Sequence, residues 1–592
     1  MRRSIKAAIL GVVAATTVAG LTTTGPVSAT TSSPAGPQEF LVVYEAGGAN
    51  AARTAIKAAG GTIVTERSIG VATVTTRNGR FQQALVGKKG IVGAARNGII
   101  GTNGSAAAKK AARDAVEKEG RAAGKTFASS LPPSHSNSST SDPLEEPFAD
   151  RQWDMQMLGA TPTGSYAEQV GSKDVRVGII DTGVDGNHPD IAPNFNSSLS
   201  RNFTTDIPLI DGACADDPDG SCSDPVNVDE DGHGTHVAST IGSPINDLGI
   251  AGVAPNVTLV NIRAGQDSGY FFLKPTVDAL MYAGDSGIDV VNMSFYIDPW
   301  LYNCPAAAPA MTWQDPNNPG TGKKPADSAV EQAEQQAIIA ATERALTYAW
   351  DNGVTLVGAA GNSFTDLGAD PKVDESSPDY PPGAERHRIV SNACLDLPTE
   401  GSHVISVSSV GPSGRKADYS NYGLEQASVA APGGWFRDGL GTKSFRTAEN
   451  MILAAYPEGV ARANAEITKG GGVPNNEFVL RDCAKAGGPC AYYQYIQGTS
   501  MAAPHATGVA ALIVSEFGVP DTRAQGGLTM SPAAVEARLY ESAEEHACPP
   551  GGVQSYTDVG RPASWTATCV GTTKFNGFYG HGIVNALNAV KP

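Results

Sequence analysis

Asp181, His233 and Ser500 are the residues of this 592-residue chain whose types and surroundings could carry out nucleophilic catalysis. Asp181 follows the apolar run VGII, His233 stands in DEDGHGTHVAST, and Ser500 stands in IQGTSMAAPHATGVAALIV. The patterns predict that Asp181 ends a buried strand and that His233 and Ser500 begin helices. In a doubly wound sheet, ligands gather at the carboxyl ends of strands, which is where this carboxylate would lie.

Acyl transfer needs each of these residue types. A serine hydroxyl is a weak nucleophile at neutral pH and requires a base within hydrogen-bonding distance. Histidine titrates near neutrality, so it can accept that proton and return it to a leaving amine. A carboxylate fixes the tautomer of the imidazole and stabilises the imidazolium. The backbone N–H of Ser500 and the side-chain amide of Asn362, in LVGAAGNS, could stabilise a developing oxyanion.

Four segments, in the order DTGVD, HGTHVA, AAGN and GTSMAAPH, resemble the subtilisin-like serine peptidases over roughly residues 150–592. The resemblance implies a Ser-His-Asp acyl-enzyme mechanism acting on protein or peptide substrates. It assigns Asp181, His233 and Ser500 as the catalytic triad and Asn362 as the oxyanion amide.

The same resemblance implies that two extended segments line the substrate cleft. The candidate substrate-binding residues on them are Ser294, Phe295, Tyr296, Ala359, Ala360 and Gly361. Tyr296 departs from the family pattern, in which glycine is usual at this position. A ring there is expected to narrow the pocket or to change how the substrate backbone lies against it.

No cofactor is expected for the chemistry, but the family often binds calcium near the turn after the catalytic acid. Asp190 and Asn246 occupy the matching positions, nine residues after Asp181 and thirteen after His233. Calcium requires six to eight oxygen ligands, so these two side chains would supply only part of a structural site. The acidic stretch 215–232 could also attract cations, although a solvated loop is the commoner explanation.

The elements that must position these residues follow an α/β pattern. Short, nearly continuous apolar runs at 174–180, 258–263, 288–295, 353–360 and 403–410 alternate with helical stretches such as 275–287 and 340–353. Strands buried on both faces have this composition. The sequence therefore predicts a parallel α/β sheet flanked by helices and preceded by a small α+β domain, and the resemblance implies that the sheet is subtilisin-like.

The N-terminal part predicts a precursor. Residues 1–29 have the charged start, apolar stretch and small residues of a signal peptide. Residues 38–100 read as β-α-β-β-α-β and are similar to the inhibitory, chaperone-like propeptide of the family. Residues 101–149 are predicted to be a linker, with a helical stretch at 105–125, and 150–592 to be the peptidase domain. Long insertions are expected near 298–340, 363–400 and 433–490.

Charge is distributed unevenly. Residues 30–125 carry a net charge of +8, whereas 126–592 carry −28. This predicts that the basic propeptide associates with the acidic body, and it disfavours nucleic acid as a partner. No membrane association is expected after signal removal, and a secreted, extracellular monomer is the expected state. The eight cysteines of an exported chain predict disulfides, with Cys214/Cys222 and Cys483/Cys490 close enough in sequence to close small loops.

Three functions compete. The leading one is a secreted serine endopeptidase made as a precursor. The second is an exopeptidase on the same scaffold that releases short N-terminal peptides, for which the insertions would have to block one end of the cleft. The third is an inert binding protein, which the intact Asp181, His233 and Ser500 disfavour.

Overall fold

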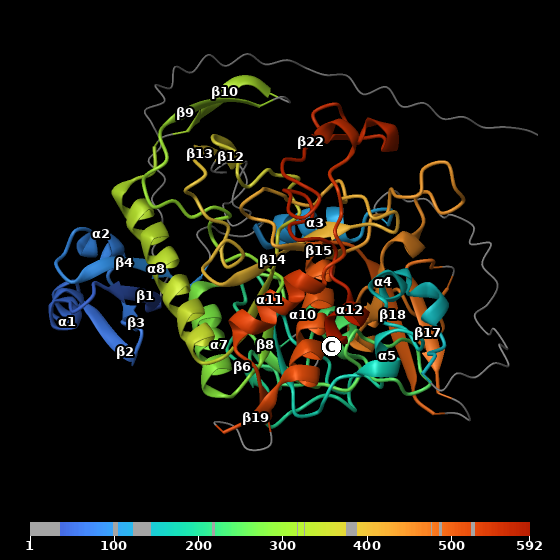
Figure 1. The fold of residues 1–592 in the computed structure, drawn as a ribbon. Coiled ribbons are helices and arrows are strands. Elements are labelled where there is room, and N and C mark those ends of the chain that lie inside the picture. The colour runs from blue at the N-terminus through green and yellow to red at the C-terminus, as the bar shows by residue number, and fades with distance from the viewer. Residues whose placement is uncertain are drawn as a thin grey trace, which may run out of the picture.

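The computed structural model describes residues 36–98, 105–121, 144–215, 220–315, 318–324, 326–374, 387–474, 476–484, 488–522 and 527–592. The predicted signal peptide lies outside these residues. The centre of the molecule is a seven-stranded parallel sheet in the order β15-β14-β11-β8-β5-β7-β6 (Figure 1). Its strands are β5 (Arg176–Ile180), β6 (Arg201–Asn202), β7 (Thr258–Arg263), β8 (Val290–Met293), β11 (Thr355–Ala359), β14 (Val404–Val410) and β15 (Val429–Pro432).

Strand β5 lies at the point where the order of the strands reverses, because later strands are added on both of its sides. It pairs with β7 on one side and with β8 on the other, so Val177 lies between Leu259 and Val290. A crevice forms at the carboxyl edge of a parallel sheet where the strand order reverses in this way. The predicted parallel α/β architecture is confirmed, and the residue after β5 is Asp181.

Helices cover both faces of the sheet. One core combines strand residues such as Val177 with α6 (His233–Gly242) and α10 (Thr499–Phe517). The other combines residues such as Val291 with α7 (Leu273–Asp285) and α8 (Ala329–Asp351). The sequence of α10 is apolar around its whole circumference, and its residues are buried from Thr499 to Val514. A helix with this composition is stable only inside a core.

Helix α8 begins earlier than the predicted helical stretch at 340–353 and takes up part of the predicted insertion at 298–340. Its first turn is fixed by a capping box, in which the Ser328 hydroxyl accepts a hydrogen bond from Glu331 N and the Glu331 carboxylate accepts one from Ser328 N. An S-x-x-E pattern before an apolar stretch marks the N-terminus of a helix, so the start of α8 is visible in the sequence.

A separate four-stranded antiparallel sheet, ordered β2-β3-β1-β4, precedes the main domain. Its elements occur in the β-α-β-β-α-β order expected from the sequence. They are β1 (Gln38–Tyr44), α1 (Ala49–Ala58), β2 (Gly61–Arg67), β3 (Val71–Thr76), α2 (Phe81–Leu85) and β4 (Ile91–Arg96).

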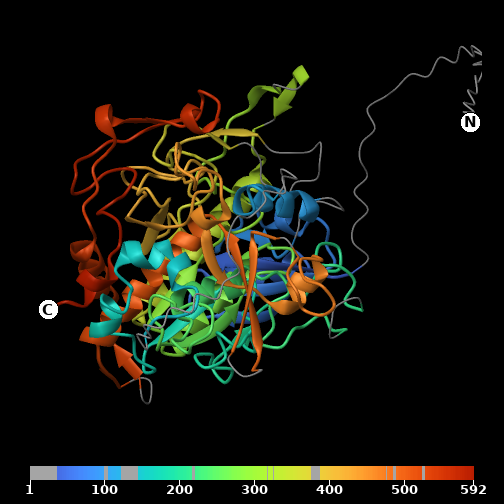
Figure 2. The same ribbon diagram turned by 90° about the vertical axis from the view of Figure 1, so that its right-hand side faces the viewer.

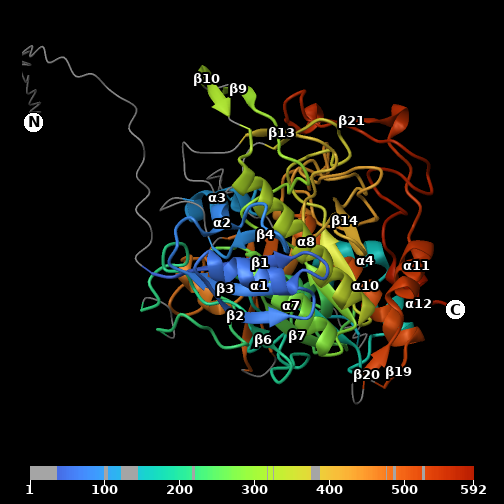
Figure 3. The same cartoon turned by 90° about the vertical axis from the view of Figure 1, so that its left-hand side faces the viewer.

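This small sheet packs directly on α7 and α8 (Figure 3). Its residues Leu41, Val43, Val71 and Ala95 belong to the same buried cluster as Ile338 of α8. Polar contacts surround this cluster. Arg67 pairs with Asp278, Gln82 Nε2 donates to Glu334 Oε1 at 2.8 Å, and Arg344 Nη2 donates to the Tyr44 carbonyl at 2.9 Å.

Helix α3 (Ser105–Glu117) lies away from this small sheet, over the main domain (Figures 1 and 2). Arg113 pairs with Asp231, and Arg121, just beyond the helix, pairs with Glu466 at 2.6 Å. The segment predicted as a linker at 101–149 therefore contains a helix that is anchored to the main domain. The reason is its pattern of charged side chains, which meet opposite charges on the body.

Peripheral elements surround the main sheet. They include a three-stranded sheet, ordered β16-β18-β17, whose long strands are drawn in orange in Figure 2. The bounds are η1 (Ala149–Arg151), α4 (Trp153–Leu158), α5 (Ser165–Glu168), β9 (Met311–Asp315), β10 (Asn318–Lys324), β12 (Lys372–Asp374), β13 (Arg388–Val390), η2 (Ala448–Asn450), β16 (Ile452–Ala455), α9 (Glu458–Ala463), β17 (Val479–Cys483), β18 (Cys490–Ile496), β19 (Val519–Asp521), β20 (Gly527–Thr529), α11 (Pro532–Ser542), η4 (Pro550–Gly552), β21 (Val553–Ser555), η5 (Thr557–Val559), β22 (Thr566–Thr568) and α12 (Ala586–Val590).

All eight cysteines form disulfides. The two short loops predicted from spacing, Cys214–Cys222 and Cys483–Cys490, are present, and the other pairs are Cys304–Cys394 and Cys548–Cys569. In the part of the chain that the structure describes, no helix is both long and apolar enough to cross a bilayer.

Candidate active site

The three candidate catalytic residues come from three elements that meet at the carboxyl edge of the sheet. Asp181 follows β5, His233 is the first residue of α6, and Ser500 is the second residue of α10. Gly232, just before α6, has φ of 97°, a left-handed conformation that glycine adopts without strain and that starts the helix at the histidine.

Asp181 and His233 form a buried hydrogen-bonded pair. The His233 Nδ1–H donates to Asp181 Oδ1 at 2.7 Å, and the same oxygen accepts from Thr182 N at 2.8 Å. Asp181 has no exposed surface and His233 is 6% exposed. This bond fixes the tautomer and leaves Nε2 as the ring nitrogen that can exchange a proton with a substrate.

Ser500 and Asn362 together supply a nucleophile and an oxyanion site. The Asn362 side chain is held through its oxygen, which accepts from Thr499 N and Thr499 Oγ1, both at 2.9 Å. Its amide nitrogen therefore points away from Thr499 and can donate to a ligand. The Ser500 hydroxyl lies at the N-terminal end of α10 and donates to the Ser294 carbonyl at 3.4 Å.

Glu117, the last residue of α3, lies against the candidate catalytic histidine. Its Oε1 is 3.6 Å from His233 Nε2, the ring nitrogen that Asp181 does not hold. Burial alone would lower the pKa of His233, but the carboxylates of Asp181 and Glu117 outweigh burial and raise the pKa to about 9. The raised pKa favours the imidazolium in this arrangement, and a protonated imidazole cannot act as a general base.

Arg113 and Asp231 fix the position of Glu117. Arg113 pairs with Asp231 at 2.5 Å and with Glu117 at 3.5 Å, so one guanidinium joins α3 to the turn before His233. Burial would raise the pKa of Asp231, but the guanidinium of Arg113 and the charge of Lys110 lower it. Neither Glu117 nor Arg113 was among the residues singled out from the sequence. Because they lie more than a hundred residues from His233 in a charged helix, only the fold reveals their contact.

The first predicted substrate-binding segment is tied to the nucleophile. Ser294 Oγ donates to the Ser500 carbonyl at 3.0 Å and accepts from Asn292 Nδ2 at 2.8 Å. Phe295 is partly buried and stacks on Phe271, with ring centroids 4.1 Å apart, and Tyr296 is also partly buried. The segment therefore lies beside Ser500, and it carries two partly buried aromatic rings, those of Phe295 and Tyr296.

The second predicted segment begins at the last residue of β11, and its carbonyl groups accept hydrogen bonds from other parts of the protein. Thr399 Oγ1 donates to the Ala359 carbonyl at 2.6 Å, and Asn421 donates to the carbonyls of Ala360 and Gly361, both at 2.9 Å. Gly361 N donates to Thr499 Oγ1 at 3.0 Å. Thr499 thus joins this segment to Asn362 and to the start of α10.

The predicted calcium residues are adjacent, but hydrogen-bond donors surround their carboxylate. Asp190 Oδ1 accepts from Asn246 Nδ2 at 3.2 Å, and Oδ2 accepts from the Tyr493 hydroxyl at 3.0 Å. Glu146 accepts from the backbone N–H groups of 246, 247 and 248 at 2.5–3.0 Å. Calcium requires oxygen ligands that face inward, so this arrangement, in which N–H and O–H groups face the carboxylates, does not fit the ion.

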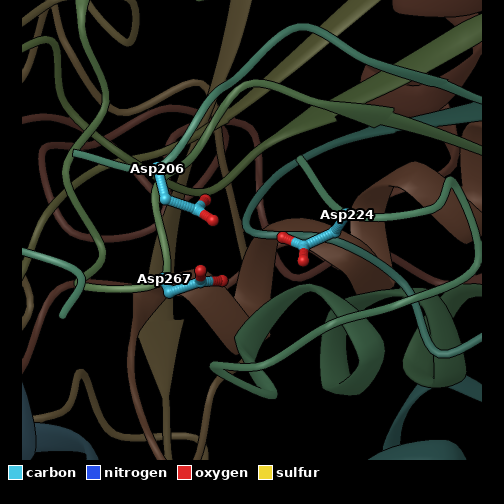
Figure 4. Close-up of side chains that lie close together, drawn as sticks. All are labelled: Asp206, Asp224 and Asp267. Atoms are coloured by element: carbon cyan, nitrogen blue, oxygen red, sulfur yellow. The ribbon is translucent and has the colours of Figure 1, made fainter. Parts of the chain in front are cut away.

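Three further carboxylates, those of Asp206, Asp224 and Asp267, lie within reach of one another (Figure 4). A cation of the protein itself lies among them, because Arg263 pairs with Asp224 and, at 2.7 Å, with Asp267. Burial raises the pKa of Asp267 to about 8, with Arg263 opposing the shift. The guanidinium therefore takes the place that a metal ion would need, and we assign no metal to this cluster.

A buried Asp–His pair and a serine at a helix start, meeting at the carboxyl edge of a parallel sheet, define a serine hydrolase with the chain order Asp, His, Ser. Comparison with protein families gives the particular group: the model of the subtilase family matches residues 172–582. The chain belongs to the subtilase family, and it is a subtilisin-like serine peptidase.

Curated relatives agree with this assignment, and a solved structure has a similar fold. The chain is 26% identical to thermitase of Thermoactinomyces vulgaris over 375 residues, which is 63% of this chain and 86% of thermitase. It is 25% identical to subtilisin DY of Bacillus licheniformis over 343 residues, 58% of this chain and 77% of that protein. The crystal structure of the epidermin leader peptide processing serine protease from Staphylococcus aureus has a similar fold. Its TM-score is 0.53 at 20% identity, and the match covers 94% of this chain and 98% of that one.

Proposed function

We propose that the protein is a secreted serine endopeptidase, made as a precursor, that uses Asp181, His233 and Ser500. The observation that carries this proposal is the buried 2.7 Å hydrogen bond between His233 and Asp181. Ser500 contacts Ser294, which follows the strand next to the one that ends before Asp181. Substrates are proteins or peptides, and the chemistry needs no cofactor. Neither a nucleic acid nor a membrane is a partner of the mature chain, which acts as a monomer.

The reaction follows from the positions of these groups. Ser500 Oγ attacks the substrate carbonyl while His233 Nε2 takes its proton, and Asp181 stabilises the resulting imidazolium. The Asn362 amide and the Ser500 N–H donate to the oxyanion. His233 then gives the proton to the leaving amine, and a water activated by the same nitrogen hydrolyses the acyl-enzyme. Residues 294–296 and 359–361 hold the acyl side of the substrate.

The precursor form is supported by the contacts of the N-terminal elements. The sheet β1–β4 covers α8, and Glu117 of α3 lies on the nitrogen that must accept the serine proton. Residues 38–121 are therefore proposed to act as an inhibitory propeptide, so that the pro-region is longer than the 38–100 unit suggested by pattern alone. Secretion is supported by the signal-like residues 1–29 and by the four disulfides.

The proposal is tested with the mature enzyme, a fluorophosphonate probe and peptides blocked at both ends. The probe should label Ser500, and the blocked peptides should be cleaved internally. Ser500→Ala should lose both properties, whereas Ser515→Ala, which changes another serine of α10, should keep both. Cleavage only of peptides with an unblocked N-terminus would instead identify an exopeptidase, and absence of labelling and cleavage would identify an inert protein.

A further inference from the structure

We infer that Arg437, Arg561 and Gln497 form a carboxylate-binding subsite in the mature enzyme, which favours substrates carrying an acidic side chain on the leaving-group side of the scissile bond. In the precursor this subsite holds Glu119, two residues beyond the end of α3. The inference rests on the proposed function and adds a substrate preference to it.

Both oxygens of Glu119 are bound in this subsite. Arg437 Nε lies 2.6 Å from Oε1, and Arg561 Nη2 lies 3.4 Å from Oε2. Gln497 Nε2 donates to Oε2 at 3.2 Å. Two guanidinium groups and one amide on a single carboxylate form the kind of charge-assisted, directional site that arginine provides for carboxylates.

The subsite does not depend on Glu119 for its shape. Arg561 Nε pairs with the buried Asp418 at 2.5 Å, and the guanidinium of Arg561 lies 4.3 Å from the ring of Trp565. Arg437 Nη1 donates to the Val559 carbonyl at 3.0 Å. Each arginine is thus oriented by groups of the main domain that stay in place when the pro-region leaves, so the subsite is preorganised for another ligand.

Charge also favours an acidic occupant. Two guanidinium groups share one carboxylate, that of Asp418, so removal of Glu119 leaves a net positive charge. With Glu119 in place, Arg437 and Arg561 are 18% and 19% exposed, so both guanidinium groups are partly buried in the docked state. This positive site belongs to a body whose net charge is −28, so it is a local exception to the charge of the molecule.

The subsite lies next to the catalytic residues. Gln497, three residues before Ser500, donates from its backbone to the Glu117 carbonyl at 3.1 Å, and Glu117 lies against His233 Nε2. Glu119 is therefore two residues from the residue that contacts the catalytic histidine. We place the subsite on the leaving-group side because the described polar contacts of 116–121 avoid both segments assigned to the acyl side.

The test uses mature wild-type enzyme and internally quenched peptides blocked at both ends. The peptides differ only by glutamate or glutamine at each of three positions on either side of the scissile bond. At one leaving-group-side position, glutamate should raise kcat/KM roughly tenfold over glutamine, the effect expected of a hydrogen-bonded charge pair. Added salt should reduce this ratio, because screening weakens partly exposed charges.

Variants assign the preference to the named residues. Arg437→Gln should abolish most of the glutamate-to-glutamine ratio, and Arg437→Lys should restore part of it, because lysine keeps the charge without the guanidinium fork. Arg415→Gln, which removes a nearby arginine paired with Asp558, should leave the ratio unchanged. A ratio within one preparation is independent of how much enzyme matures, so a reduced yield of a variant does not affect the result.

The outcomes separate this inference from the proposed function. Cleavage of the glutamine peptides without a glutamate preference, or a preference that persists in Arg437→Gln, would overturn the subsite alone. A preference on the acyl side would overturn its placement. Absence of cleavage together with absence of Ser500 labelling would instead contradict the endopeptidase.

Discussion

The contact between Glu117 and His233 links the proposed inhibition to protonation of the histidine. Asp181 first and Glu117 second stabilise the imidazolium against the effect of burial, so the pKa of His233 is raised to about 9. The raised pKa means that these two carboxylates stabilise the folded chain fully below pH 6.5, the ordinary value, and that this contribution is lost as the pH rises through about 9. Because Glu117 supplies the smaller part of this effect and belongs to α3, docking of α3 should weaken in alkaline solution.

We predict that Glu117→Gln lowers the pKa of His233 in the Ser500→Ala precursor. Imidazole resonances followed by NMR across pH 5–10 give this value directly. Glu119→Gln is the control, because Glu119 contacts Arg437, Arg561 and Gln497 instead of the histidine. An unchanged His233 titration in Glu117→Gln would show that Asp181 alone accounts for the raised pKa.

Glu146 provides a second prediction at the residue scale. Burial raises its pKa to about 7 and outweighs the three N–H donors. A raised carboxyl pKa stabilises the fold below about pH 4.5, the ordinary value, and this contribution is lost as the pH rises through about 7. Glu146→Gln should therefore flatten the dependence of Tm on pH between 5 and 7.

Calcium can be tested in the same melts. Because donors surround Asp190, a chelator should leave the Tm of the wild type unchanged. A fall in Tm on chelation, reversed by calcium, would show that the loop 245–249 rearranges to bind the ion. For the Glu146→Gln melts, Glu145→Gln is the matched control, because it removes the same charge from an exposed neighbouring residue.

At the scale of the elements, the contact between β4 and α8 is unusually close. A Cβ added to Gly93 would overlap the carbonyl oxygen of Ala333, a backbone atom that cannot rotate away. Gly93→Val should therefore push the small sheet away from α8 and reduce the yield of folded, processed enzyme. Active-site labelling of the secreted material measures that yield.

Gly36→Val is the matched control, because a Cβ at Gly36 meets no atom within 4 Å. An equal yield from the two variants would show that the close contact with α8 does not assist folding.

The elements also show how far sequence reasoning extends. The buried strands, the helix start at His233 and the position of Ser500 were predictable because each depends on a local pattern of apolar residues and turns. The pairing of Cys304 with Cys394 and the docking of Glu117 on His233 were not, because they depend on which distant segments the fold brings together. The start of α8 at Ala329 was predictable from Ser328 and Glu331, but the prediction set it later.

At the scale of the whole molecule, the anchors on both sides of residues 122–143 bracket the interval in which the proposed maturation would cut. Arg121 is paired with Glu466, while Phe148 is buried and its N–H donates to the Gly249 carbonyl at 2.7 Å. A cut between 121 and 146 releases the pro-region without disturbing the N-terminus of the main domain. The predicted mature chain therefore begins in this interval.

If the enzyme cuts its own chain, Ser500→Ala should accumulate as a precursor that lacks only the signal peptide. The N-terminal sequence of the variant, secreted by a host without other proteases, measures this, with Ser515→Ala as the normally processed control. A mature N-terminus in Ser500→Ala would assign the cut to another protease.

Glu334 of α8 makes the proposed release of the small sheet sensitive to pH. The carboxyl is buried beneath that sheet, where Gln82 Nε2 and Arg96 N donate to it, and burial raises its pKa. If the pro-region departs, water reaches this group and stabilises its ionised form. Rebinding would then require the carboxylate to take up a proton or to lose its water, so the affinity of a released propeptide for this surface should fall as the pH rises.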